Sequence, residues 1–268
     1  MAIAQAAHEL MARRTAGAAG ERLADAIRVT NIEQALAVQA AASQLWCSQN
    51  NDRIGAWKAG LPGPGRLVIA PIFASTIQTA TVVSVWPTRS PRASEPVARI
   101  EPEVAFVLGE DLPPRPQPYT PEEVRAAISQ VRLALELIGG RHERPEDCSF
   151  AEKLADSLEN QGLFLGDEID ASLAFAAREL SIGFTDNRGT QMLAGKHPAG
   201  DPAAPVYWLA DYLRSRGEGL RAGQVVITGC YTQVLDIAFG ETVSLCYRTA
   251  DASVTLGQID VQFQPRKG

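Results

Sequence analysis

Two apolar segments of this chain carry glutamates within them, and this feature restricts the folds that the chain can adopt. Segment 99–108 reads Arg-Ile-Glu-Pro-Glu-Val-Ala-Phe-Val-Leu, and segment 131–138 reads Val-Arg-Leu-Ala-Leu-Glu-Leu-Ile. Side chains i and i+2 of a strand share a face, so we expect Glu101 and Glu103 to project together. Glu136 is flanked by apolar residues, where an isolated carboxylate is costly unless it is paired or binds a metal. A divalent cation held between the two segments would satisfy all three side chains.

The ligand type indicates which cation this would be. Carboxylate oxygens without nearby Cys or His favour Mg²⁺, Mn²⁺ or Ca²⁺ over zinc. Three protein ligands leave positions on an octahedral ion open for water or a chelating substrate, which favours a catalytic site. In the alternative interpretation, the first two glutamates lie on a solvated strand edge marked by Pro102, and Glu136 pairs with Arg132 or Arg141. The apolar surroundings of Glu136 favour the metal.

Length and charge exclude several classes of partner. The chain has 268 residues, enough for one large domain or for one domain with a helical extension. Lys plus Arg number 25 against 31 for Asp plus Glu, a net charge of −6, which gives no electrostatic reason to expect nucleic acid or a membrane. Four scattered cysteines form no C-x-x-C pair and are expected to be reduced. Because we find neither a secretory signal pattern nor a membrane-spanning run, we expect a cytoplasmic protein.

Helical patterns dominate the start of the chain. Residues 1–52 are expected to form a helical segment, in which Thr30-Asn-Ile-Glu33 is a capping box that opens a helix. A second capping box, Thr120-Pro-Glu-Glu123, places Pro at the first helical position. Further helices are expected at three places: 121–130, 149–160 and 202–214, the last with Asp201 as its N-cap.

From Ile54 onward the chain consists mainly of short β-branched runs divided by Gly and Pro. Strands are expected at 67–70, 81–85, 104–108, 131–138, 224–228, 242–246 and 258–263. Residues 53–268 are therefore expected to form the metal-binding catalytic domain. Strands far apart in sequence, with segregated helices and no βαβ rhythm, predict an α+β fold with a mixed sheet wrapped into a roll or barrel.

One lysine stands out among small and apolar residues, in Gly55-Ala-Trp-Lys-Ala-Gly60. The Lys58 ammonium could meet a substrate carboxylate or enolate and exchange protons. Alternatively, its stem lies along Trp57 with the ammonium in water. The glycine-rich stretch 60–65 matches neither the Rossmann fingerprint nor a P-loop, so we expect a mobile loop or lid. No G-x-S-x-G elbow appears, which argues against a serine hydrolase.

Three histidines offer little further signal. His8 lacks the second histidine of a zincin motif. His142 and His197 lie in polar loops and are expected at the surface, although His142 follows Glu136 closely enough to be a weak candidate for the cavity.

Several motifs follow one another along the chain in a distinctive order and spacing. They are Gly55-x-x-Lys58-x-Gly60, Pro71-Ile-Phe73, Glu101-Pro-Glu-Val-Ala-Phe106, Ala134-Leu-Glu-Leu-Ile138 with Arg141, Trp208-Leu-Ala210 and Ile227-Thr-Gly229. Taken together, they resemble the 2-keto-4-pentenoate hydratase family, and the resemblance runs from Ile32 to Phe263. This family belongs to the fumarylacetoacetate hydrolase superfamily and also contains the 4-oxalocrotonate decarboxylases.

The resemblance implies a mixed β-roll of the fumarylacetoacetate hydrolase C-terminal-domain type with an N-terminal helical part. It implies Mg²⁺ or Mn²⁺ held by Glu101, Glu103 and Glu136, with Lys58 working at the substrate. Such enzymes hold a 2-oxo acid through its carboxylate and C2 oxygen on the metal. The matching positions predict further substrate contacts by Ile72, Phe73, Arg141, Asp156, Thr228 and Gly229. A homo-oligomer is also implied, with a complex between homologous decarboxylase and hydratase as a further possibility.

The chain departs from the family pattern around the expected pocket rim. Leu61-Pro62 replaces Thr-Ser, and Asp201 replaces the histidine of Gly-His-Pro. Ser157 ends a partial Ala-Asp-Asn motif, and Gln224 replaces the aspartate of Gly-Asp. The metal ligands are kept while the rim changes, so the substrate tail is less determined than the metal site.

Four functions follow as hypotheses. The first is a hydratase of a 2-hydroxy-2,4-dienoate or its 2-oxo-4-enoate tautomer, in which the metal stabilises enolate charge. The second is a decarboxylase of a 2-oxo-3-enedioate, which needs the same enolate. Hydrolysis of an acylpyruvate is disfavoured because no His-Glu pair is evident to activate water. The fourth is an inactive metal-binding subunit that stabilises a partner enzyme.

Overall fold

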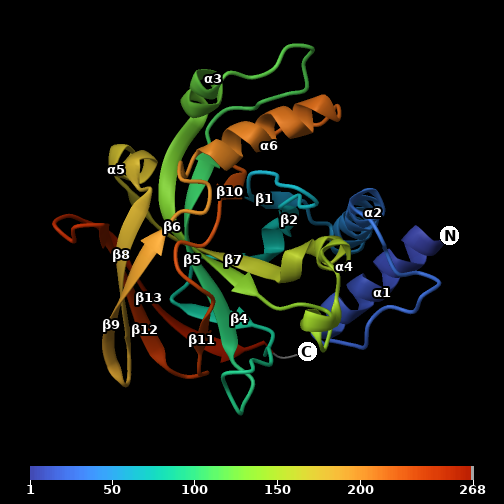
Figure 1. Ribbon diagram of the computed structural model, residues 1–268, viewed down its shortest axis with the longest axis horizontal. Helices are drawn as coiled ribbons and strands as arrows, with labels where there is room; N and C mark the ends of the chain where they lie inside the picture. Colours follow the sequence, from blue (N-terminus) through green and yellow to red (C-terminus); the bar gives the residue numbers. More distant parts are fainter. Residues whose placement is uncertain (267–268) are drawn as a thin grey trace.

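The computed structural model describes residues 1–266, and two β-sheets form its centre (Figure 1). The larger sheet has the strand order β2-β1-β10-β5-β6-β7-β3, and β11 pairs with β5. Most neighbours are antiparallel, whereas β1–β10 and β3–β7 are parallel. The strands are β1 (Ile54–Ala59), β2 (Ile69–Phe73), β3 (Ile77–Gln78), β5 (Ala98–Leu108), β6 (Ile128–Ile138), β7 (Asn160–Ile169), β10 (Val225–Ile227) and β11 (Leu235–Ile237).

The smaller sheet has five strands in the order β4-β13-β12-β8-β9. Only the β4–β13 pair within it is parallel. Its strands are β4 (Val82–Val85), β8 (Glu179–Asp186), β9 (Gly189–Lys196), β12 (Thr242–Thr249) and β13 (Thr255–Pro265). The mixed sheets confirm the predicted α+β class.

The two faces of the larger sheet pack differently, and this difference places the functional side chains. One face contributes to the main core with residues that include Trp57, Val104, Phe106, Leu133, Leu135 and Leu137. The other face carries a separate cluster of smaller residues, Ala56, Ile72, Ala105, Ala134, Leu163, Val225 and Ile227. Side chains alternate along a strand, so Lys58, Glu103 and Glu136 share the second face with Ala56, Ala105 and Ala134.

Six α-helices surround the sheets within the described part of the chain. Figure 1 shows α1 and α2 on one side of the molecule, away from β8 and β9, and α6 beside β1 and β10. The N-terminal helical part predicted from the sequence is therefore present. The helices are α1 (Ala2–Ala16), α2 (Ile32–Asn50), α3 (Pro121–Ala126), α4 (Phe150–Ala155), α5 (Ala171–Ala176) and α6 (Ala204–Ser215).

Several helix boundaries differ from the sequence prediction. Asn31 rather than Thr30 caps α2, accepting the Gln34 N–H, while the Gln34 side chain reaches back to the Thr30 N–H. The capping box at Thr120 is confirmed, but α3 ends at Ala126 because β6 begins two residues later. The helix expected over 149–160 ends at Ala155, and that expected over 202–214 begins at Ala204.

Strands β1, β3, β7, β8, β9 and β11 were not predicted. β9 is exposed along most of its length at the edge of the smaller sheet. Its sequence Gly-Thr-Gln-Met-Leu-Ala-Gly-Lys lacks a β-branched run, so only its pairing with β8 identifies it as a strand.

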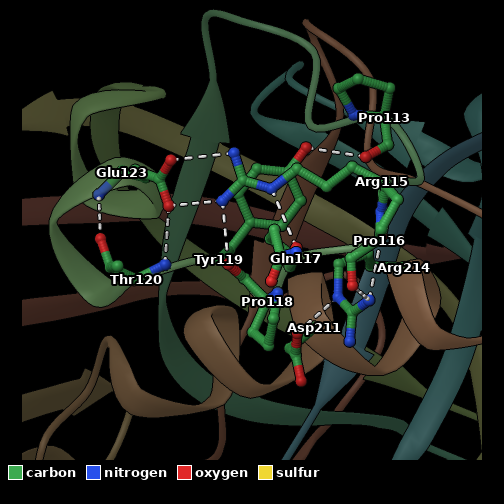
Figure 2. A network of polar contacts seen from close by, with 10 residues as sticks. All are labelled: Pro113, Arg115, Pro116, Gln117, Pro118, Tyr119, Thr120, Glu123, Asp211 and Arg214. Atoms are coloured by element: carbon green, nitrogen blue, oxygen red, sulfur yellow. Dashed lines mark hydrogen bonds and ion pairs between the residues drawn. The ribbon is translucent and has the colours of Figure 1, made fainter.

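The proline-rich loop between β5 and α3 is fastened by one arginine, Arg115 (Figure 2). Its guanidinium donates two hydrogen bonds to the Glu123 carboxylate, at 2.9 and 2.5 Å, and lies 3.8 Å from the Tyr119 ring centroid. Arg214 of α6 donates to the Arg115 carbonyl oxygen at 2.9 Å. These contacts tie the loop, α3 and α6 into one unit.

Within residues 1–266, no helix is both long enough and apolar enough to cross a membrane.

Candidate metal centre

The register of β5 against β6 assembles three carboxylates. Glu101 lies directly opposite Glu136, and Glu103 lies opposite Ala134. Each glutamate offers one oxygen, and these three oxygens all lie within 4.8 Å of one another. Residues 35 positions apart in the sequence are thus brought together by one antiparallel pairing, as the metal hypothesis requires.

Pro102 does not mark a solvated edge, so the alternative interpretation of Glu101 and Glu103 is wrong. β5 lies between β6 on one side and β10 and β11 on the other. β10 pairs with residues 105–107 and β11 with residues 98–100, which leaves a gap opposite Pro102. The Pro102 carbonyl oxygen accepts a bond from the Tyr231 N–H in this gap. A proline is tolerated mid-strand because no ladder partner requires its missing N–H.

Lys58 reaches the carboxylates from β1. Its Nζ lies 2.6 Å from Glu136 Oε2 and 3.4 Å from Glu101 Oε2. The side chain is only 14% exposed, so the alternative with its ammonium in water is wrong. Burial alone would lower the Lys58 pKa, but the charges of Glu136, Glu101 and Glu103 raise it above its usual value. The ammonium is therefore the counter-ion that the structure supplies to these glutamates.

The burial of the glutamates disfavours their charged form unless other groups compensate the charge. Glu103 and Glu136 are fully buried. Burial, with repulsion from Glu136 and Glu101, raises the pKa of Glu103 well above its usual range. Burial also raises the pKa of Glu136 to about 7, although Lys58 opposes this shift. One lysine does not compensate three carboxylates.

Two neutral groups hold the carboxylates in place. The Gly229 N–H donates to Glu103 Oε2 at 2.6 Å, and the Asn160 side chain donates to Glu136 Oε1 at 2.9 Å. Glu103 Oε1 is buried and accepts no hydrogen bond from any residue in the range 1–266. A site with three hard oxygen donors, surplus negative charge and an unsatisfied buried oxygen fits Mg²⁺ or Mn²⁺.

The segment after β10, which contains Thr228 and Gly229, donates to Glu103 and is itself held by the buried His197. His197 Nδ1 accepts the Ala199 N–H, so its Nε2 carries the proton and donates to Thr228 Oγ1 at 3.2 Å. Gly229 has φ +129°, and a Cβ there would lie 2.6 Å from Pro198. Glycine is therefore required where the backbone turns its N–H toward Glu103.

Burial lowers the pKa of His197 to about 4, so the imidazole is neutral at pH 7. His142 is buried as well. The expectation that both histidines lie at the surface is therefore wrong: a polar loop sequence does not reveal that the loop is packed beneath another segment.

The predicted substrate contacts have different surroundings. Ile72 lies in the cluster on the metal-bearing face. Phe73 follows it and stacks on Trp46, with ring centroids 5.1 Å apart. Thr228 and Gly229 lie beside Glu103 as described above. Leu61 of the expected rim is exposed, whereas the Gln224 side chain donates to the Ile54 carbonyl oxygen and so supports β1.

Arg141 and Asp156 form a buried ion pair rather than an open binding surface. Arg141 donates from Nε and from its main-chain N–H to the Asp156 carboxylate. It also donates to the carbonyl oxygen of Asn160 at 2.8 Å, and the Asn160 side chain contacts Glu136. The pair is thus linked to the metal centre through Asn160, and a direct substrate contact by either residue stays a prediction.

A strained turn precedes Asn160. Ser157, Leu158 and Glu159 have φ values of 53°, 53° and 65°, a left-handed conformation that costs non-glycine residues free energy. The turn connects α4 to β7 and delivers Asn160 to Glu136. Asn160, His197 and Tyr231 were not predicted as parts of the site, and no local sequence pattern singles them out.

Comparison with known proteins finds relatives both by sequence and by structure. A 2-keto-4-pentenoate hydratase from Paraburkholderia xenovorans is 30% identical over 149 residues, 53% of this chain and 52% of the relative. The match thus spans about half the length of that relative. 2-Keto-4-pentenoate hydratase 2 from Dechloromonas aromatica is 26% identical over 231 residues, covering 82% of this chain and 83% of the relative. No family model matches the chain.

The solved structure of 4-oxalocrotonate decarboxylase from Pseudomonas putida G7, in complex with magnesium and adipate, superposes with a TM-score of 0.77. It is 19% identical, and the alignment covers 98% of this chain and 97% of that one. The chain is therefore a homologue of proteins named 2-keto-4-pentenoate hydratase and 4-oxalocrotonate decarboxylase, and it has the fold of the fumarylacetoacetate hydrolase superfamily.

Proposed function

We propose that this protein is a divalent-metal-dependent hydratase that adds water to a 2-hydroxy-2,4-dienoate or its 2-oxo-4-enoate tautomer. The observation that carries the proposal is the convergence of Glu101, Glu103 and Glu136 with Lys58 on one buried face. The names of the curated relatives support the same reaction class. We further propose that the protein is a cytoplasmic homo-oligomer and that its substrate is a small 2-oxo acid.

Mg²⁺ or Mn²⁺ would be held by Glu101, Glu103 and Glu136. When bound, it supplies a Lewis acid for the carboxylate and C2 oxygen of the substrate. The protein supplies the rest: the Gly229 N–H and the Asn160 side chain orient two of the three carboxylates. Their fixed positions lower the reorganisation needed during the reaction.

Lys58 is the candidate for proton movement and charge compensation. Its ammonium pairs with Glu136 and Glu101. If Mg²⁺ or Mn²⁺ balanced the charge of these carboxylates, the Lys58 ammonium would be free to contact the substrate. Lys58 would then hold the carboxylate of the 2-oxo acid or move the proton exchanged in tautomerisation.

A decarboxylase of a 2-oxo-3-enedioate is the second candidate. It is favoured by the extent of the structural likeness to 4-oxalocrotonate decarboxylase, which covers nearly all of both chains. Both reactions need a negative charge stabilised at the C2 oxygen, so the same three glutamates and Lys58 serve either.

Incubation with 2-hydroxypenta-2,4-dienoate and with 2-oxohex-3-enedioate, each with and without Mg²⁺, distinguishes the two. Hydration is measured as loss of the dienoate ultraviolet absorbance, and decarboxylation as release of CO₂. We expect Mg²⁺-dependent hydration that Glu103→Gln abolishes. Glu122→Gln, an exposed glutamate in α3, is the matched control and should retain full activity.

Undiminished turnover in chelator-treated protein would contradict the metal mechanism. Mg²⁺ binding without turnover of either compound, together with increased activity of a co-purifying homologue, would instead favour a non-catalytic metal-binding subunit.

A further inference from the structure

A cavity lined by several arginines lies outside the metal centre. It has a volume of about 270 Å³ and forms where the end of α1, segment 86–99 and the turn after β6 meet. Neither Lys58 nor any of the three metal-centre glutamates lines it. Its volume suits a small molecule rather than a nucleotide or a protein segment.

The charges that line this cavity are unbalanced. Five arginines and two glutamates, Glu143 and Glu159, line it. Three of the arginines have carboxylate partners: Arg13 pairs with Glu9, Arg99 with Asp236 and Arg141 with Asp156. Within residues 1–266, Arg14 and Arg89 have no such partner.

Arg14 is the unusual member of this set because it is only 4% exposed. Its hydrogen bonds run to two main-chain carbonyl oxygens, those of Asn160 and Gln161, at 3.0 and 3.3 Å. A guanidinium has five N–H donors, so most of its donor capacity is not used by these bonds. Burial, with repulsion from Arg141, lowers the Arg14 pKa to about 9. The guanidinium also lies over the rings of Trp46 and Phe73, 5.4 and 4.9 Å from their centroids, but these rings accept none of its remaining N–H bonds. An anion would satisfy those donors.

His142 supplies an independent observation. It lines the same cavity and is only 6% exposed. Both of its ring nitrogens are buried and form no hydrogen bond with residues 1–266. Leaving a buried donor or acceptor unpaired is unfavourable, so an imidazole in this position points to a polar ligand.

The C-terminal end of α1 does not repel an anion in the cavity. The carbonyl oxygens of Arg13 and Arg14 accept the N–H groups of Ala18 and Gly17, so the negative end of the helix dipole is capped. A Cβ on Gly17 would lie 2.1 Å from the Trp86 ring, so the ring packs directly on the helix end. This contact closes one wall of the cavity.

We propose that this cavity is a binding site for a small oxyanion, a carboxylate or a phosphate, held by the Arg14 guanidinium and the His142 ring, with Arg89 at its exposed rim. Such a group would accept bonds from the unused guanidinium N–H donors and from a protonated ring nitrogen of His142. None of the three metal-centre glutamates lines this site, and the proposal does not rest on the proposed reaction.

The chain has only three histidines, so the ring signals of His142 can be assigned by NMR with one substitution, His142→Gln. Sodium phosphate and sodium acetate are titrated separately into wild-type protein, at an ionic strength held constant with NaCl, with and without Mg²⁺. We expect a saturable shift of the His142 ring signals while those of exposed His8 do not move. The anion that saturates at the lower concentration identifies the ligand class, and saturation without Mg²⁺ separates this site from the metal centre.

Arg14→Met keeps the aliphatic stem and should weaken binding at least about tenfold. Arg89→Gln tests the exposed rim without disturbing buried residues and should weaken it by a smaller factor. Arg144→Gln is the matched control, since Arg144 is exposed and lies outside the cavity wall, and it should bind as wild type does. The proposal is overturned if neither anion shifts the His142 signals, or if Arg14→Met and Arg89→Gln both bind with wild-type affinity.

Discussion

Glu103 and Glu136 are acidic side chains in a setting that disfavours their charged form. Both are fully buried, and both have a raised pKa. Their burial is unfavourable for the fold in the absence of a cation. A divalent cation would relieve the repulsion between these carboxylates, which water screens only weakly because they are buried.

Glu103→Gln should therefore change stability in opposite directions with and without metal. The amide keeps the shape and can still accept the Gly229 N–H, while one of three like charges is removed. We expect the metal-free variant to unfold at a higher temperature than metal-free wild type at pH 8. Wild type should gain about 2.7 kcal/mol from Mg²⁺ at one hundred times its Kd, and the variant should gain much less. Equal stabilisation of both proteins by Mg²⁺ in thermal unfolding would contradict the assigned ligand set.

His197 should make stability depend on pH below neutrality. Its pKa is about 4 in the folded protein against 6.5 ordinarily, so the unfolded chain binds the extra proton between these values. Stability contributed by the neutral imidazole is full above pH 6.5 and is lost as pH falls toward 4, by on the order of 2–3 kcal/mol. Urea unfolding of wild type and His197→Gln across this range measures it. The variant should show a flatter pH dependence, and an unchanged slope would refute the assignment.

At the scale of elements, short irregular segments position the side chains that regular strands cannot. The gap between β10 and β11 admits Pro102, and the left-handed turn 157–159 brings Asn160 to Glu136. The left-handed turn costs backbone energy, and both features lie beside the metal centre.

Ser157→Gly tests the strain in this turn. The left-handed conformation costs an L-residue roughly 1–2 kcal/mol, and glycine loses about 0.5–1 kcal/mol through its freedom in the unfolded chain. We therefore expect a free energy of unfolding that is higher by about 0.5–1 kcal/mol. Ser181→Gly in β8, where the backbone is extended, should instead lower it by a similar amount. Chemical denaturation of both variants provides the comparison, and a loss of stability in Ser157→Gly would show that the turn is unstrained.

At the scale of the whole molecule, the N-terminal helices are bound to the rest of the chain by buried polar contacts as well as by the common core. Arg14 of α1 bonds to β7, and the Gln39 side chain of α2 donates to the carbonyl oxygens of Ile69 and Leu154. Apolar residues of both helices belong to the main cluster.

Deletion of residues 1–52 should for this reason leave a chain that does not unfold cooperatively. The deletion exposes apolar surface of the main core and leaves buried carbonyl oxygens without donors. Circular dichroism during thermal unfolding measures cooperativity, and the full chain is the control. Cooperative unfolding of residues 53–268 with normal Mg²⁺ stabilisation would show instead that they fold alone.

Sedimentation equilibrium of the full chain tests the predicted homo-oligomer.

The sequence by itself determined the fold class and the three glutamates. Period-two alternation and isolated charge are local properties, so Glu101, Glu103 and Glu136 could be recognised without coordinates. Helix ends, and strands made of polar or small residues, could not be recognised from the sequence. β9, for example, is a strand only through its pairing with β8.

Only the tertiary structure decided which groups surround the glutamates. Asn160, Gly229 and His197 come from segments with no local signal, and their contacts with the site or with its support arise from chain pairing and from burial. Burial likewise decided that His142 and Arg14 line a cavity rather than the surface. The physical reason is that desolvation depends on what packs over a side chain, and residues distant in sequence supply that packing.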